Sequence, residues 1–118
     1  MHANTIALIL AISASAFGYS NNCEGSSNSP DINDCYAALD NIDVGANYED
    51  QAEFSTGSCY LVYATNGSGP QPVSGQTVHD IASNILAQCG HHKGSFGTGK
   101  CDACHVTVNY RSPKKFRA

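Results

Sequence analysis

The chain of 118 residues is poor in basic side chains and has no long apolar run beyond its first residues. Its first basic residue apart from histidine is Lys93. All charged residues between Cys23 and Phe54 are acidic, namely Glu24, Asp31, Asp34, Asp40, Asp43, Glu49, Asp50 and Glu53. Because phosphate binding needs a basic surface, this distribution argues against a nucleic-acid partner. The sequence also lacks a phosphate-cradling glycine loop and a serine in a nucleophile elbow.

A short apolar run lies at residues 5–12 and is followed by small residues at 13–16. It is far shorter than the roughly 20 residues that span a bilayer, and the small residues match the pattern at signal-peptide cleavage sites. We therefore predict a secreted protein with a signal peptide at 1–16, one domain at 17–110 and a basic tail at 111–118. The sequence has no second apolar stretch, so we expect no membrane anchor. The tail either contacts anionic lipid or a wall polymer, or is a solvated chain end.

All six cysteines follow the apolar run, which in a small exported chain predicts three disulfides. They are Cys23, Cys35, Cys59, Cys89, Cys101 and Cys104. Cross-links are expected because a domain of this size buries little apolar surface. Cys101 and Cys104 form a C-x-x-C pair near three histidines, a set that could bind zinc. A second such pair is missing and export favours oxidised sulfur, so we expect no metal and no cofactor.

Two helices and several strands are expected from the residue pattern. One helix starts at Ser29-Pro30-Asp31, with Ser29 as its cap, and ends at Gly45; the other runs from Ser74 to Gly90. Strands are expected at 59–63 and 104–110, a weaker one at 48–54, and either a short strand or a turn at 94–99. The pattern predicts an α+β fold: a single-domain two-layer α/β sandwich, with an antiparallel sheet of about four to five strands packed by two helices and stapled by disulfides. We expect a monomer.

Two further patterns bear on chemistry. Asn66-Gly67-Ser68 is a sequon for N-glycosylation in a turn-rich segment. A small secreted hydrolase such as a ribonuclease is an alternative from another functional class, because such proteins are also acidic and disulfide-bonded. Ribonucleases of this kind need a glutamate, a histidine and an arginine together. The arginines here are Arg111 and Arg117, at the end of the chain, so we expect no catalytic residues and no enzyme activity.

Several motifs together resemble the fungal killer-toxin family typified by the virus-encoded toxin of a smut fungus. They are Asn22-Cys23-Glu24-Gly25-Ser26, the cysteine-led strand from Gly57 to Tyr63, Ser74-Gly75 with its helix to Cys89-Gly90, and Val106-Thr107-Val108-Asn109-Tyr110. Ser29-Pro30-Asp31-Ile32-Asn33-Asp34-Cys35 is similar to the helix start of the fungal necrosis-inducing extracellular effectors. The resemblance implies a secreted toxin or plant-directed effector. In the toxin family the implied mode is binding a cell-surface protein or ion channel of a competitor or host cell and disturbing calcium uptake.

The resemblance also implies a disulfide between Cys23 and Cys89. We expect Cys101 and Cys104 not to pair with each other, because a bridge across two residues constrains the unfolded chain little and would interrupt a strand. Cys35 and Cys59 then pair with Cys101 and Cys104 in one of two ways. Strand ends can meet at disulfide distance, which favours Cys59 with Cys104 and Cys35 with Cys101.

A loop at residues 90–100 is the expected recognition surface, because binding residues concentrate in loops held by a rigid frame. We expect it to present five target-binding residues, His91, His92, Lys93, Phe96 and Lys100. A plain connecting loop is the alternative.

Overall fold

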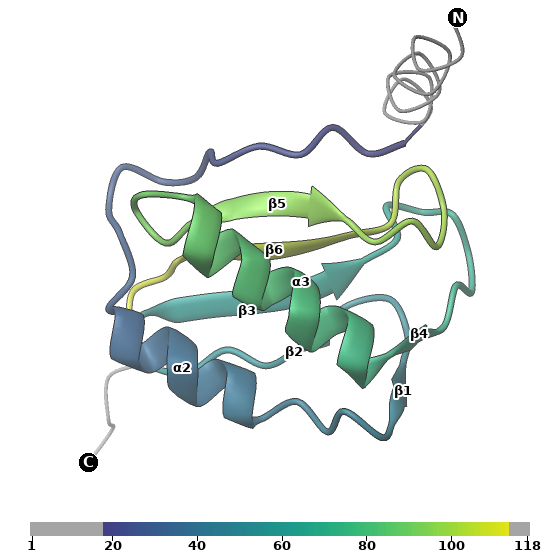
Figure 1. Ribbon diagram of the computed structural model, residues 1–118, viewed down its shortest axis with the longest axis horizontal. Helices are drawn as coiled ribbons and strands as arrows, with labels where there is room; N and C mark the ends of the chain where they lie inside the picture. Colours follow the sequence, from purple (N-terminus) through teal and green to yellow (C-terminus); the bar gives the residue numbers. More distant parts are fainter. Residues whose placement is uncertain (1–17, 114–118) are drawn as a thin grey trace, which may run out of the picture.

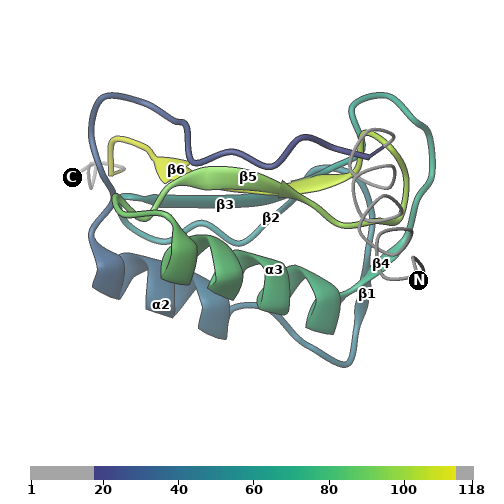
Figure 2. The ribbon, with the colours of Figure 1, turned by 45° about the horizontal axis from the view of Figure 1, so that its top comes forward.

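The computed structural model describes residues 18–113, so the expected signal peptide at 1–16 and residues 114–118 of the expected tail lie outside it. Helices α2 (Ile32–Asp40) and α3 (Gly75–Gln88) cover one face of a four-stranded antiparallel sheet (Figures 1 and 2). The strands of this sheet lie in the order β2 (Ala52–Glu53), β3 (Cys59–Ala64), β6 (His105–Tyr110) and β5 (Gly94–Gly97). A separate two-stranded ribbon pairs β1 (Asn47–Tyr48) with β4 (Val73–Ser74). The expected disulfide-stapled α+β sandwich is confirmed.

Helix α2 begins later and ends earlier than the sequence pattern predicts. Its cap is Asp31, whose Oδ1 accepts a hydrogen bond from the backbone N–H of Asn33 at 2.8 Å; the predicted cap, Ser29, precedes it. The helix ends at Asp40, and its C-cap Asn41 donates its side-chain amide to Thr56 Oγ1 at 2.9 Å. Gly45 is therefore not its end.

Helix α3 matches its sequence pattern closely. Ser74 caps it as expected, with Ser74 Oγ accepting from the backbone N–H of Thr77 at 3.1 Å. Its last residue is Gln88, and Cys89 closes the final turn by donating its backbone N–H to the carbonyl of Ile85. The apolar side of the helix packs against the sheet and buries Val78, Ala82 and Ile85.

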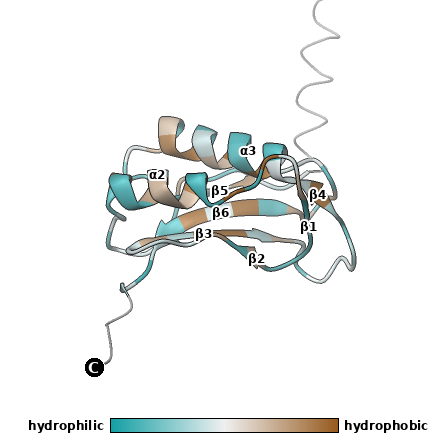
Figure 3. Ribbon diagram, turned by 90° about the horizontal axis from the view of Figure 1, so that it is seen from below, coloured by the Kyte–Doolittle hydropathy of each residue, from teal (hydrophilic) through white to brown (hydrophobic). Residues whose placement is uncertain are grey.

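The core lies between the helices and the two central strands. β3 and β6 pair over their whole length, with Leu61 opposite Val108 and Tyr63 opposite Val106, and all four side chains are fully buried. Figure 3 shows apolar residues along these strands beneath the helices. Burying side chains of this size contributes about 1.5–3 kcal/mol each. The central pair and α3 therefore form the frame to which the other elements attach.

The expected strand at 48–54 is wrong. The chain turns at Gln51, whose φ of 70° lies in the left-handed region, so β1 and β2 are separate strands in separate sheets. Asp50 stabilises the turn, because its Oδ1 accepts the backbone N–H of Thr65 at 2.8 Å. The resulting ribbon of β1 and β4 stands at one end of the molecule, beside the start of α3 (Figure 1).

An N-terminal segment, residues 19–28, runs beside the edge strand β5 (Figure 1). Asn22 and Ser95 exchange two backbone hydrogen bonds of 2.9 Å, and Asn21 Oδ1 accepts the backbone N–H of Gly97 at 2.7 Å. A Cβ atom on Gly97 would lie 2.7 Å from Cβ of Tyr19, so glycine is needed for this close approach. The segment thus occupies the hydrogen-bonding edge of β5.

Candidate functional site

Three disulfides pair all the cysteines. Cys23 pairs with Cys89, as the resemblance implies. The other two expected pairs are wrong, since Cys35 pairs with Cys59 and Cys101 with Cys104.

The packing explains both corrections. Helix α2 lies on β3, which brings fully buried Cys35 within a Cα–Cα distance of 5.1 Å of Cys59. The C-x-x-C pair lies in a turn where the backbone N–H of Cys104 donates to the carbonyl of Cys101 at 3.1 Å. Strand β6 starts only at His105, so this bridge does not interrupt it.

The loop at 90–100 does not present its five expected binding residues together. Lys93 is only 9% exposed, and its Nζ donates to the carbonyls of Ser26 at 2.6 Å and Asn28 at 3.1 Å. Phe96 is 8% exposed, because β5 turns it into the core. The prediction that these two residues face a target is therefore wrong. Lys93 holds the N-terminal segment and Phe96 fills the core.

The two adjacent histidines remain near the surface. His91 is exposed, whereas His92 is half-buried with a φ of 60°, and its Nδ1 is buried without a hydrogen-bond partner among residues 18–113. His92 holds the turn that follows α3 by donating its backbone N–H to the carbonyl of Cys89 at 3.1 Å. Target binding by His91 and His92 stays a prediction.

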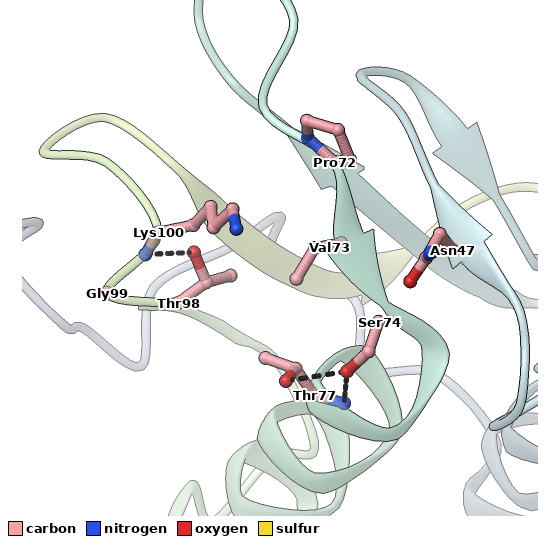
Figure 4. Close-up of a pocket in the computed structure, with 8 residues that line it drawn as sticks. All are labelled: Asn47, Pro72, Val73, Ser74, Thr77, Thr98, Gly99 and Lys100. Atoms are coloured by element: carbon pink, nitrogen blue, oxygen red, sulfur yellow. Dashed lines mark hydrogen bonds between the residues drawn. The ribbon is translucent and has the colours of Figure 1, made fainter.

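Lys100 is exposed and lines a cavity of about 430 Å³ (Figure 4). The loop after β5 forms one wall of this cavity, and the ribbon of β1 and β4 together with the first turn of α3 forms the rest. The lining residues are Asn47, Pro72, Val73, Ser74, Thr77, Thr98, Gly99 and Lys100. This volume falls within the range of about 300–1,000 Å³ that is usual for small-molecule sites.

Most of this lining could not be recognised from the sequence. Lys100 and its neighbours belong to the loop expected to bind, but Asn47, Pro72 and Val73 come from or adjoin two-residue strands. Strands of this length show no alternation of polar and apolar residues. The cap signal at Ser74 marked the start of α3 without indicating what lies beside it.

The segment after β6 is bound to the fold at Arg111. Its Nε donates to the carbonyl of Gly57 at 3.0 Å, and its Nη1 lies 3.3 Å from Glu53 Oε2. Asp34 belongs to the same corner, since its Oδ2 accepts both the backbone N–H and the hydroxyl of Ser58, at 2.8 and 2.9 Å. These bonds, the backbone one first, lower the pKa of Asp34. The corner ties α2 to the start of β3 and the end of β6.

His105 and His79 contact residues other than Glu53 and Arg111. His105 Nδ1 is 2.9 Å from the carbonyl of Ala103, and its ring stacks on Tyr19 with centroids 4.4 Å apart. His79 Nδ1 is 3.5 Å from Asp80 Oδ1. Within residues 18–113, no hydrogen bond or ion pair joins a histidine to Glu53 or Arg111.

The described part of the chain shows neither a cluster of metal ligands nor a membrane-spanning helix. Residues 18–113 contain no group of three or more histidine, cysteine or acidic side chains placed to hold a metal ion. No helix within the same range is long and apolar enough to cross a bilayer.

Asn66 lies in the turn between β3 and β4. It is exposed, with a φ of 50°, and the space beside Gly67 and Gly69 is open. The turn is held by the backbone N–H of Ser68, which donates to the carbonyl of Thr65 at 3.1 Å. The sequon is therefore accessible, and its glycosylation stays a prediction.

No family model, no curated protein and no solved structure matches this chain.

Proposed function

We propose that the chain is a secreted recognition protein of the killer-toxin-like type, which binds a cell-surface protein or ion channel of a competing fungus or host plant and disturbs calcium uptake. The observation that carries the proposal is the complete pairing of six cysteines within one small α+β frame. Disulfides of this density are typical of exported domains, which must keep their shape outside the cell. Surface loops held by such a frame can bind a partner without a large ordering cost.

The resemblance of the motifs supports the toxin or effector class. The pairing of Cys23 with Cys89 agrees with the pairing that the resemblance implies. In this proposal the protein acts on its target cell by binding alone. A necrosis-inducing effector acting on a plant would use the same mode on another target.

The test is to apply the purified, oxidised protein separately to fungal cultures and to plant leaves. Growth arrest indicates a toxin and leaf necrosis an effector, and calcium uptake by the affected cells should change. A matched control is the same protein after reduction and alkylation, which removes the disulfides and leaves the sequence unchanged. Inertness toward both targets would contradict the proposal. Cleavage of RNA by the protein would instead favour the hydrolase alternative.

A further inference from the structure

The cavity beside Lys100 has an apolar floor and polar walls. Val73, only 4% exposed, lies at its base beside Pro72 (Figure 4). Lys100 and Asn47 lie on opposite sides of it. Neither side chain makes a hydrogen bond or ion pair with another residue in the range 18–113, so both are free to bind a ligand.

Three hydroxyl groups, those of Ser74, Thr77 and Thr98, complete the polar lining. Thr77 Oγ1 lies 2.9 Å from Ser74 Oγ, and Thr98 Oγ1 accepts the backbone N–H of Lys100 at 3.1 Å. Thr98 Oγ1 also donates to the carbonyl of Cys104 at 3.4 Å. Each oxygen can still accept a further hydrogen bond, because a hydroxyl has one donor and two acceptor sites. The cavity thus offers one cation, one amide and three hydroxyls around an apolar surface.

The wall that carries Lys100 is held by local bonds. Thr98 donates its backbone N–H to the carbonyl of Cys104 at 2.9 Å, and the Cys101–Cys104 disulfide closes the turn that follows. A bridge with a sequence separation of 3 closes so small a loop that it adds little to global stability compared with the other two. Its main effect is therefore local: it fixes the shape of residues 98–104, and a pre-shaped wall loses less entropy on binding.

We propose that this cavity binds an acidic sugar of the uronic-acid class. The carboxylate would pair with the Lys100 ammonium, the ring hydroxyls would bond to Asn47, Thr77 and Thr98, and the apolar C–H face of the ring would lie on Val73 and Pro72. A single cation with neutral polar groups and an apolar floor suits a hydroxylated monocarboxylate better than a phosphate, which is usually held by several charged or backbone donors. The biological meaning of this site rests on the proposed recognition function, whereas the binding itself does not.

The test is a titration of ¹⁵N-labelled, oxidised protein followed by NMR. The probes are glucuronate, glucose as the neutral match, and acetate as the carboxylate without a ring. Glucuronate should shift the amide signals of Asn47, Val73, Gly99 and Lys100 and bind more tightly than either control. No shift at these amides, or equal binding of glucose or acetate, would overturn the proposal.

Variants locate the interaction. Lys100→Gln should weaken glucuronate binding about tenfold, equivalent to about 1.4 kcal/mol, because it removes a charge-assisted hydrogen bond. Arg111→Gln makes the same charge change at a residue that does not line the cavity and should bind as the wild type does. Unchanged affinity of Lys100→Gln would also overturn the proposal, and the amide spectrum of each variant reports whether it is folded.

The same variant separates this site from the proposed function. If Lys100→Gln loses glucuronate binding but still arrests growth or causes necrosis, the sugar site stands and recognition of the cell target lies elsewhere. If the protein binds glucuronate but is inert toward cells, the toxin or effector function fails and the sugar site stands. A tri-galacturonate probe shows whether the site takes a free sugar or a residue of a polymer.

Discussion

Pairwise replacement of cysteines by alanine should affect the three disulfides very unequally. The bridges have sequence separations of 66 for Cys23–Cys89, 24 for Cys35–Cys59 and 3 for Cys101–Cys104. The chain-entropy relation converts these separations into stabilisations of about 4.3, about 3.4 and about 1.6 kcal/mol, because a longer closed loop restricts the unfolded chain more. The Cys101→Ala/Cys104→Ala variant is thus expected to be the most stable of the three.

The native environments of the two shorter bridges support the smallest loss at Cys101–Cys104. Cys35 and Cys59 are both fully buried, so replacing them also leaves a cavity in the core. In the local pair Cys104 is fully buried, whereas Cys101 is partly exposed. Packing losses therefore add to the entropy loss at Cys35–Cys59 at least as much as at Cys101–Cys104.

Guanidinium unfolding measures the effect through the midpoint and the slope of each transition. The Cys101→Ala/Cys104→Ala variant should stay folded and cooperative, with a midpoint well above those of the other two variants. A loss at this pair as large as the loss at Cys23–Cys89 would refute the chain-entropy reasoning. The same variant should bind glucuronate more weakly, because the wall of the cavity is then less ordered.

Three further outcomes are expected. Lys93→Met should lower the free energy of unfolding, measured in denaturant, by about 1–3 kcal/mol, because two backbone acceptors lose their buried donor. Lys100→Met, at an exposed site, should change stability by less than about 0.5 kcal/mol. Equal losses in the two variants would contradict the role given to Lys93. Folding lowers the pKa of Asp34 below 3.8, chiefly through the Ser58 N–H, so the stabilisation is fully present above that pH and is lost as pH falls through the folded-state pKa. Asp34→Asn should therefore flatten the dependence of melting temperature on pH between about pH 5 and pH 2, whereas an unchanged acid sensitivity would argue against this bond. Secreted protein from a eukaryotic host should lose mass on treatment with an N-glycosidase and Asn66→Gln should not; a wild type without this loss would show an unmodified sequon.

The elements with a regular residue pattern could be predicted from the sequence. Helix α3 has both a capping serine and an apolar side at helical spacing, and β3 and β6 combine branched, aromatic and alternating residues. Each of these elements is long enough for its own pattern to indicate its structure. The ribbon of β1 and β4 has two residues in each strand, and the turn before β2 depends on Asp50, which bonds to a residue distant in sequence. Local pattern cannot reveal such a bond.

The candidate site was predictable only in part, for a related reason. Lys100 lies in the loop that we expected to be a binding surface. Lys93 belongs to the same loop, but it donates hydrogen bonds to carbonyl groups far away in the sequence. In the structure, burial alternates along β5, and Phe96 lies between two half-buried neighbours. The disulfide error had the same origin, because the pairing of Cys35 depends on which strand α2 covers.

The place of the N-terminal segment has a consequence for folding during synthesis. A chain that emerges N-terminus first releases Cys23 and then Cys35, whereas the native partner of Cys23 follows only 66 residues later. Its backbone partner Ser95 also emerges late. Cys23 therefore meets two non-native partners, Cys35 and Cys59, before Cys89 is available. Any early bond of this kind must be exchanged by thiolate attack, a step that takes seconds to hours without an isomerase. The first of the described segments to be made is thus fixed in place only after most of the domain has emerged.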